Sequence, residues 1–245
     1  MDVTTWISHR GYCESTTENT AESFRAALEH GFTHLETDLR CSSDGHIVLC
    51  HDPDLGRIAR HFVPIHLMSR AELQRVELPN GQRLLFFDEF FEEFSKFDWI
   101  LDIKPENAAQ TITKLHALTS DDSVKNFLEK HARFLCWNAQ HEDILAARIP
   151  KAKFMARDKA CYRAGTAALF GLPGLGSIQR NQTYAVPPVL KGVPILNKGV
   201  VSRFHDQGAK VIGYLPETKR QHEQALKAGV DELLTNHAHF KPAFD

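Results

Sequence analysis

Short apolar runs recur along the chain, and several of them are followed by stretches with helical periodicity. This alternation is typical of βα units arranged around a parallel sheet. The candidate strands are residues 4–9, 33–39, 46–52, 99–104, 133–138, 153–157, 210–215 and 231–236. Eight strands in a chain of 245 residues favour a (β/α)8 barrel over an open sheet, because such barrels commonly fill about 250 residues. We therefore expect a single domain over residues 1–245.

Two predicted helices carry signals at their ends. In the segment ENTAESFRAALEHG, Asn19 followed by Glu22 predicts a capping box, and Gly31 predicts the end of the helix. Gly229 ends the predicted helix in ETKRQHEQALKAG in the same way. The intervening stretch 157–200 is less regular: GLPGLG and AVPPVL indicate turns, and a strand is placed near 177–181.

The connection between the second and third candidate strands is too short for a parallel crossover. It contains the six residues RCSSDG, whereas a crossover needs about 10 to 12. A hairpin with a two-residue turn at Asp44 and Gly45 is the expected solution. That turn pairs residues whose numbers add up to 89, so Asp38 would lie opposite His51 and Glu36 opposite Pro53. Residues 53–82 are expected to form an excursion from the barrel after this third strand.

Composition restricts the class of protein. Lys and Arg number 29 against 31 Asp and Glu, so no overall field would attract nucleic acid or an anionic membrane. We expect a soluble, cytoplasmic protein without stable membrane insertion, because there is no apolar segment of signal-peptide or membrane-spanning length. Five scattered cysteines without a C-x-x-C pair argue against both a disulfide framework and a thiolate zinc site.

Four motifs end apolar runs in polar residues: ISHRG, LETDL, LCHDP and LDIKP. In a parallel barrel the carboxyl ends of the strands share one rim, so these motifs should meet. Glu36 and Asp38 are two residues apart and point to one face of a strand, and Asp102 brings a third carboxylate. Three carboxylates suit Mg²⁺ or Ca²⁺ better than zinc. The alternative for Glu36 and Asp38 is a pair of solvent-facing acids.

The same motifs supply groups for proton transfer and for anion binding. His9 and His51 are candidates for general acid and base. Arg10 and Lys104 offer positive charge for the non-bridging oxygens of a phosphate. Each of these residues alone is commonly an ordinary polar side chain or a salt-bridge partner. Together with a metal they predict a site that neutralises an anionic transition state.

These residues, in this order, resemble the signature of the glycerophosphodiester phosphodiesterase family. The likeness is dense from residue 6 to about residue 57, through SHRG, ENTAESFRAALEHG and HLETDLRCSSDGHIVLCHD, and looser at LDIKPE and GVDELLTN. The resemblance implies a (β/α)8 TIM barrel of the phosphatidylinositol phospholipase C-like type with a divalent cation. The activity it implies is metal-dependent hydrolysis of small glycerophosphodiesters to sn-glycerol 3-phosphate and an alcohol.

The resemblance also assigns roles by matching position. Glu36, Asp38 and Asp102 match metal ligands, His9 and His51 match the catalytic acid/base pair, and Arg10 and Lys104 match phosphate contacts. Asn19 matches an asparagine of the family, although a helix cap accounts for it equally well.

Three departures from the family pattern bear on the substrate. Asp102 stands where the family usually has glutamate, Tyr214 where it has a tryptophan-containing strand, and Asn236 ends a strand that usually ends in T-D. One alternative is a lysophospholipase D or sphingomyelinase D-like activity, with an apolar lining from residues 60–68, namely Phe62, Val63, Ile65, Leu67 and Met68. Another is a non-catalytic barrel that binds a phosphorylated metabolite. The sequence carries no signal for a particular oligomeric state.

Overall fold

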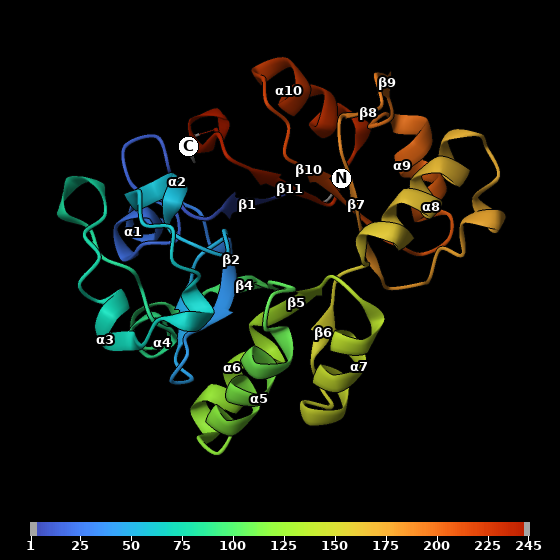
Figure 1. Ribbon diagram of the computed structural model, residues 1–245. Helices are drawn as coiled ribbons and strands as arrows, with labels where there is room; N and C mark the ends of the chain where they lie inside the picture. The colour runs from blue at the N-terminus through green and yellow to red at the C-terminus, as the bar shows by residue number, and fades with distance from the viewer. Residues whose placement is uncertain (1–3, 243–245) are drawn as a thin grey trace. The chain divides into compact units, whose positions relative to one another are not determined.

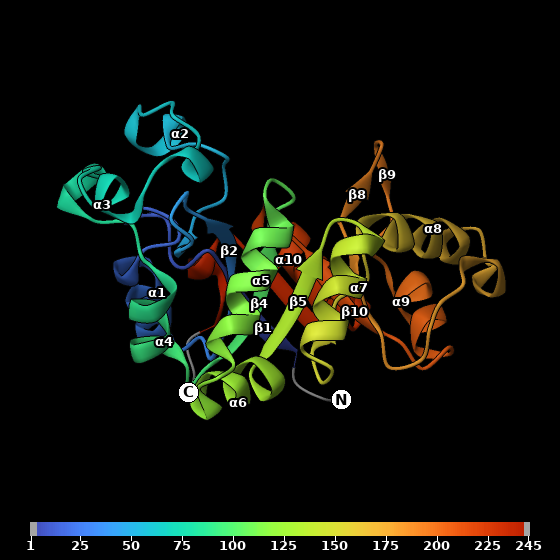
Figure 2. The ribbon, with the colours of Figure 1, turned by 60° about the horizontal axis from the view of Figure 1, so that its bottom comes forward.

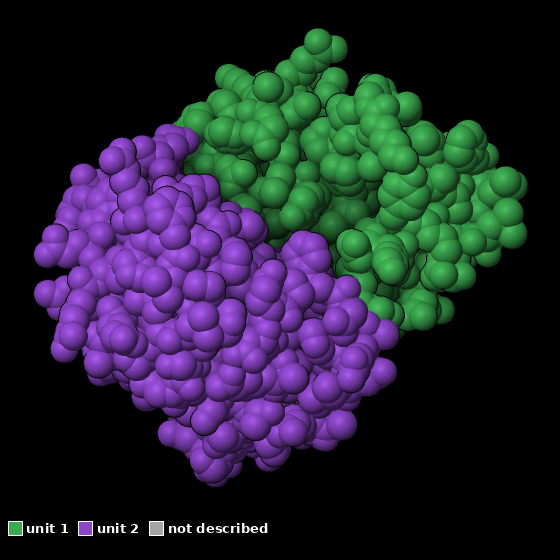
Figure 3. Space-filling view, viewed as in Figure 1, with its two compact units in different colours: residues 1–9, 155–245 green, residues 10–154 purple. Residues whose placement is uncertain are grey.

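The structure of the chain is a computed structural model that describes residues 4–242. The chain divides into two compact units, which Figure 3 colours separately: residues 1–9 with 155–245, and residues 10–154. We describe each unit by itself, with the element labels of Figure 1.

The unit of residues 10–154 is built on parallel strands in the order β6-β5-β4-β2. These strands are β2 (His34–Cys41), β4 (Asp98–Ile103), β5 (Ala132–Cys136) and β6 (Lys153–Phe154), and β3 (Ile47–Leu49) pairs antiparallel with β2. The longer helices are α1 (Ala21–Glu29), α4 (Phe87–Phe94), α5 (Ala108–Leu118), α6 (Asp122–Lys130) and α7 (Ala139–Arg148). The α1 and α4 helices pack through aromatic side chains.

The apolar spacing of α4 explains this packing. Phe87, Phe90 and Phe94 recur at helical spacing and are buried. The ring of Phe90 lies 4.6 Å from that of Trp99, centroid to centroid, and the ring of Phe24 in α1 lies 4.9 Å from it, both in edge-to-face geometry. Burial of each such ring stabilises the fold by about 1.5–3 kcal/mol.

Residues 53–82 form the predicted excursion after the third strand. They contain only short elements: α2 (Gly56–Ala59), η1 (Ile65–Leu67), α3 (Arg70–Leu73) and η2 (Pro79–Gly81). A small hydrophobic cluster with Leu55, Ile65 and Met68 among its members holds the segment against β3. Phe62, by contrast, is 74% exposed.

The hairpin between β2 and β3 is present, but its predicted register is wrong by one residue. Leu39 pairs with Leu49 and Cys41 with Ile47, so paired numbers add up to 88. The loop has three residues, 43–45, because Ser42 pairs with His46 through backbone and hydroxyl hydrogen bonds of 2.9 and 2.8 Å. Asp38 therefore lies opposite Cys50, whose N–H donates to the Asp38 carbonyl at 3.0 Å. The expected pairs Asp38–His51 and Glu36–Pro53 do not form.

The other unit has four parallel strands in the order β1-β11-β10-β7 among its described residues. They are β1 (Thr5–His9), β7 (Thr183–Val186), β10 (Lys210–Tyr214) and β11 (Glu232–Thr235). Three helices accompany them, α8 (Asp158–Leu169), α9 (Lys198–His205) and α10 (Lys219–Ala228), and Figure 2 shows α8 and α9 together with the hairpin of β8 (Val189–Leu190) and β9 (Val193–Pro194). Two 3-10 turns complete this unit, η3 (Pro173–Gly176) and η4 (Ala238–Phe240). The strand expected near 177–181 lies further along, in β7.

Two helix ends agree with the sequence. Gly31, at φ +77°, follows α1, and Gly229, at φ +82°, ends α10; both adopt the left-handed conformation that glycine accepts without strain. Among the described helices none is both long and apolar enough to cross a membrane.

Candidate active site

Three buried carboxylates gather on the neighbouring strands β2 and β4. Asp38 pairs with Asp102 across these strands, and Glu36 lies two residues before Asp38 on the same face. One oxygen from each side chain lies within 4.8 Å of the others. The structure thus brings together the carboxylates that the sequence proposed as metal ligands.

A buried ammonium group lies between two of these acids. Lys104 Nζ is 2.7 Å from Asp38 Oδ1 and 2.6 Å from Asp102 Oδ2. Although burial lowers the pKa of an ammonium group, Asp38 and Asp102 together hold the pKa of Lys104 above its usual value. Lys104 was expected to contact phosphate, and here its side chain is also part of the acidic cluster.

Arg10 completes the charge pattern. Its Nε lies 3.0 Å from Asp38 Oδ2. Burial would raise the pKa of Asp38, but Lys104 and Arg10 outweigh burial and lower it. The pKa of Glu36 is raised well above its usual value by burial and by the nearby Asp38.

The cluster contains three carboxylates and the positively charged side chains of Lys104 and Arg10. Its net charge is therefore −1 when all five groups are ionised. All the clustered donors are carboxylate oxygens, the ligands preferred by Mg²⁺ and Ca²⁺. The residues present therefore fit a hard divalent cation.

Asn19 contacts this cluster, and its predicted role as a helix cap is wrong. The N-cap is Thr20, which forms a capping box with Ser23 instead of Glu22. Asn19 is buried in the left-handed conformation, at φ +57°, and donates from Nδ2 to Asp38 Oδ2 at 2.8 Å. Its Oδ1 accepts from the Thr37 hydroxyl at 2.7 Å. The local signal was the adjacent Thr-x-x-Ser pattern, which offers a second capping box one residue later.

His51 ends a chain of ionic contacts. Its Nδ1–H donates to Asp52 Oδ1 at 2.8 Å, and Asp52 Oδ2 lies 2.6 Å from Arg57 Nε. Arg57 binds both carboxylate oxygens of Glu18, at 2.6 and 2.9 Å, and Glu18 lies 3.3 Å from Arg10 Nη1. Burial alone would raise the pKa of Asp52, but hydrogen bonds from His51 and Arg57 lower it. This network orients the imidazole of His51 from one side.

His9 belongs to the other unit, where it ends β1. Its Nδ1 lies 2.5 Å from Asn236 Oδ1. An amide oxygen can only accept, so this contact places the proton on Nδ1 and leaves the Nε2 lone pair for a proton. Asn236, noted as a departure from the family pattern, follows β11, the neighbour of β1.

The sequence did not single out Trp137. It follows β5, and its indole N–H donates to Asp102 Oδ1 at 2.8 Å. Lys104 Nζ lies 5.4 Å from the centre of its ring. Trp137 could have been identified as a candidate site residue because it directly follows an apolar strand, as Lys104 follows β4.

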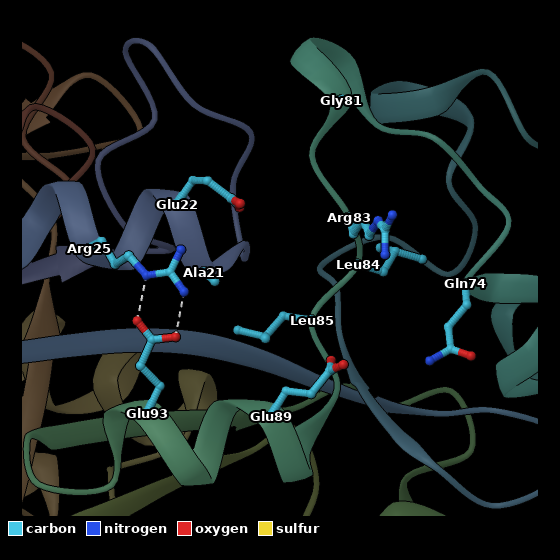
Figure 4. A pocket seen from close by; sticks show the side chains of 10 residues that line it. All are labelled: Ala21, Glu22, Arg25, Gln74, Gly81, Arg83, Leu84, Leu85, Glu89 and Glu93. Atoms are coloured by element: carbon cyan, nitrogen blue, oxygen red, sulfur yellow. Dashed lines mark hydrogen bonds and ion pairs between the residues drawn. The ribbon is translucent and has the colours of Figure 1, made fainter.

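A separate pocket of about 560 Å³ is drawn in Figure 4. It lies between α1, α4 and the segment 74–85, and Arg25 and Glu93 form a two-point ion pair across it at 2.5 and 2.6 Å. Its lining contains none of the carboxylates, histidines or phosphate-binding groups proposed from the sequence. The pocket is thus distinct from the acidic cluster.

Known proteins resemble the chain over nearly its whole length. A glycerophosphodiester phosphodiesterase of Caldanaerobacter subterraneus subsp. tengcongensis is 22% identical, covering 94% of this chain and 93% of the relative. The human lysophospholipase D GDPD1 is 32% identical over a shorter match, which covers 41% of this chain and 36% of the relative.

Solved structures show the same fold. A glycerophosphoryl diester phosphodiesterase domain from Mycobacterium tuberculosis superposes with a TM-score of 0.77 at 15% identity, covering 96% of both chains. An Oleispira antarctica phosphodiesterase in complex with the product sn-glycerol-3-phosphate gives a TM-score of 0.71 at 19% identity, covering 96% of this chain and 93% of the other.

The model of the glycerophosphoryl diester phosphodiesterase family matches residues 9–239. This match includes every site residue proposed from the sequence, from His9 to Lys104. The chain therefore belongs to the glycerophosphoryl diester phosphodiesterase family, with its (β/α)8 barrel fold and its phosphodiesterase activity.

Proposed function

We propose that the enzyme hydrolyses small glycerophosphodiesters to sn-glycerol 3-phosphate and an alcohol with the help of Mg²⁺ or Ca²⁺. The observation that carries the proposal is the buried cluster of Glu36, Asp38 and Asp102, with ligand oxygens within 4.8 Å of one another and with Lys104 and Arg10 against it. The three carboxylates would hold the cation, which when bound supplies Lewis-acid polarisation of a phosphoryl oxygen.

Arg10 and Lys104 bind the phosphate in this proposal. Lys104 has three N–H groups, of which the contacts to Asp38 and Asp102 use two. The remaining N–H and the guanidinium of Arg10 neutralise charge on the non-bridging oxygens as it develops.

The two histidines move protons in opposite directions. The hydrogen bond from His9 Nδ1 to Asn236 leaves Nε2 to take a proton from the attacking water or glycerol hydroxyl. His51 donates Nδ1–H to the carboxylate of Asp52, which orients the ring and leaves Nε2 for the leaving group. His51 Nε2 then gives its proton to the departing alkoxide.

Product analysis tests the proposal. We expect sn-glycerol 3-phosphate from glycerophosphocholine and glycerophosphoethanolamine in Mg²⁺ or Ca²⁺, and none in excess EDTA. Release that continues unchanged in EDTA would contradict the metal's role. Absence of product from both diesters would contradict the proposed substrates and point to a different diester.

A second candidate is cleavage of lysolipids in the manner of a lysophospholipase D. It is favoured by the similarity to human lysophospholipase D GDPD1 and by the exposure of Phe62, Val63 and Leu67 in the excursion. Ile65 and Met68, the other apolar residues of the proposed lining, pack into the excursion's own core instead. Lysophosphatidylcholine as a parallel substrate distinguishes the candidates, because this activity releases choline and leaves a lysophosphatidate or cyclic product.

A further inference from the structure

The loop after α8 exposes three large apolar side chains. Phe170 is 74% exposed, Leu172 55% and Leu175 73%, all within the segment 170–176. Single exposed apolar residues are normal on a protein surface, whereas a group of them marks an interaction site. The segment includes the GLPGLG motif, which has no part in the proposed catalysis.

The backbone of this loop is fixed against α8. The N–H of Gly171 donates to the Ala168 carbonyl at 3.1 Å, and the N–H of Leu172 donates to the Ala167 carbonyl at 2.9 Å. A methyl group placed on Gly176 would lie 3.1 Å from atoms of Ala164 and Ala167, so the loop returns close to the helix. Small residues therefore form the contact with α8, while the large side chains remain exposed.

Arginine side chains hold both ends of the loop. Arg203 Nη1 donates to the Ala168 carbonyl at 2.8 Å, and Arg163 Nε donates to the Gly176 carbonyl at 3.1 Å. A third arginine, Arg180, is exposed four residues after the loop. Within residues 4–242, no carboxylate forms an ion pair with any of these three guanidinium groups.

The surrounding sequence is strongly basic. Residues 155–216 contain eight lysines and arginines and only two acids, Asp158 and Asp206, in a chain whose net charge is −2. The loop therefore lies in a basic part of the sequence, whereas the chain as a whole has a small net negative charge. The nearly balanced total of acidic and basic residues does not reveal this uneven distribution of charge along the chain.

We propose that Phe170, Leu172 and Leu175, with Arg163, Arg180 and Arg203, dock the protein reversibly on an anionic lipid surface. Apolar side chains enter the boundary between headgroups and acyl chains, and nearby cations bind the lipid phosphates. A second copy of this chain fits the surface less well, because self-docking through this loop brings the same unpaired arginines together. An anionic lipid surface matches both the apolar groups and the charge.

The loop and the catalytic histidine of this unit lie at opposite ends of its sheet. The strands β1, β11, β10 and β7 are parallel, the loop precedes the start of β7, and His9 ends β1. Docking through the loop therefore leaves the end of the sheet that carries His9 away from the lipid. Substitutions in the loop should leave the turnover of water-soluble diesters unchanged.

Vesicle sedimentation with the full chain tests the proposal. We expect binding to phosphatidylcholine vesicles with one-quarter phosphatidylglycerol, and at least about tenfold weaker binding to pure phosphatidylcholine. The double variant Phe170→Ser/Leu175→Ser should weaken anionic binding at least about tenfold. Arg180→Gln, which breaks no hydrogen bond described for the loop, should weaken it about fivefold, since each basic residue near the surface contributes about 1 kcal/mol.

Matched controls make the test specific. Leu118→Ser replaces an exposed leucine at the end of α5, and Arg220→Gln replaces an exposed arginine in α10; neither should change vesicle binding. Circular dichroism and turnover of a soluble diester check that each variant is folded. Four results overturn the proposal: no binding to anionic vesicles, equal binding to neutral ones, equal losses in the controls, or loop-dependent self-association without lipid binding.

Discussion

Replacing Asn19 tests how the acidic cluster is held. Asn19→Gly keeps a residue that tolerates φ +57° and removes the amide that bonds Asp38 and Thr37. The 2.8 Å bond to the buried Asp38 carboxylate is worth about 1.5–3 kcal/mol, and the 2.7 Å bond from Thr37 is worth about 1 kcal/mol. We therefore expect a loss of about 3 kcal/mol in the free energy of unfolding. Asn19→Ala should lose about 1–2 kcal/mol more, because alanine resists the left-handed conformation.

The assay is urea unfolding at pH 7, with Asn80→Gly as the matched control. Asn80 is also left-handed, at φ +62°, but exposed, so its replacement should change the free energy of unfolding by less than about 1 kcal/mol. Apparent Mg²⁺ or Ca²⁺ affinity, from titration calorimetry, should fall about 10- to 100-fold in Asn19→Gly, because groups that orient metal ligands contribute that much. Unchanged metal affinity in a destabilised Asn19→Gly would refute the reasoning, and so would an Asn19→Ala that is more stable than Asn19→Gly.

Three further predictions follow from contacts elsewhere. His51→Asn should lower kcat by about 10²- to 10⁴-fold with an unchanged circular dichroism spectrum, and a variant that retains wild-type turnover would exclude proton transfer by His51. Trp137→Phe removes the indole N–H bound to Asp102 and should lower kcat/KM about tenfold, equivalent to about 1.4 kcal/mol; an unchanged kcat/KM would mean that this bond has no part in positioning Asp102. Burial lowers the pKa of His222 in the folded protein, so the unfolded chain binds a proton at this residue more tightly. The free energy of unfolding should therefore be highest above about pH 6.5 and should decrease as the pH falls from there toward the folded-state pKa. Urea unfolding at pH 7.5 and 5.5 checks this, and the decline should shrink in His222→Gln; an equal decline would assign the effect to other groups.

The fold class could be predicted from the apolar pattern, although two errors in the strand assignment offset each other and left the number of predicted barrel strands at eight. The run at 46–52 was counted as a barrel strand and proved to be the antiparallel β3. The strand β7 was misplaced because Thr183–Val186 is short and lies directly before two prolines, so that its pattern resembles a turn.

The hairpin register could not be predicted because an Asp-Gly pair is compatible with more than one loop length. Ser42 stabilises the three-residue loop, because its hydroxyl donates to Asp44 at 2.6 Å and accepts from the His46 N–H. The Asp44 carboxylate also accepts the N–H of Arg70, a contact 26 residues away in sequence. Local turn preferences contain no information about such a contact.

Residues at strand ends were predictable as candidates for the site, since alternation fixes which side chains share a face. Glu36, Asp38 and Asp102 meet as strand geometry requires. Asn19 and Trp137 touch the cluster from a loop and from a strand end, and their roles depend on distances that only the folded chain sets.

The ammonium group of Lys104 affects how the protein folds in the absence of a metal ion. Three acids gathered without a counter-charge would repel one another and oppose folding. With Lys104 at 2.7 and 2.6 Å from two of them, the newly made chain can assemble this region using its own cation. Metal binding then needs only a local adjustment around these carboxylates in a protein that is already folded. Depletion of divalent cations should therefore remove the activity of such an enzyme without unfolding it or exposing it to proteolysis. Adding the cations back should restore the activity without the help of a chaperone.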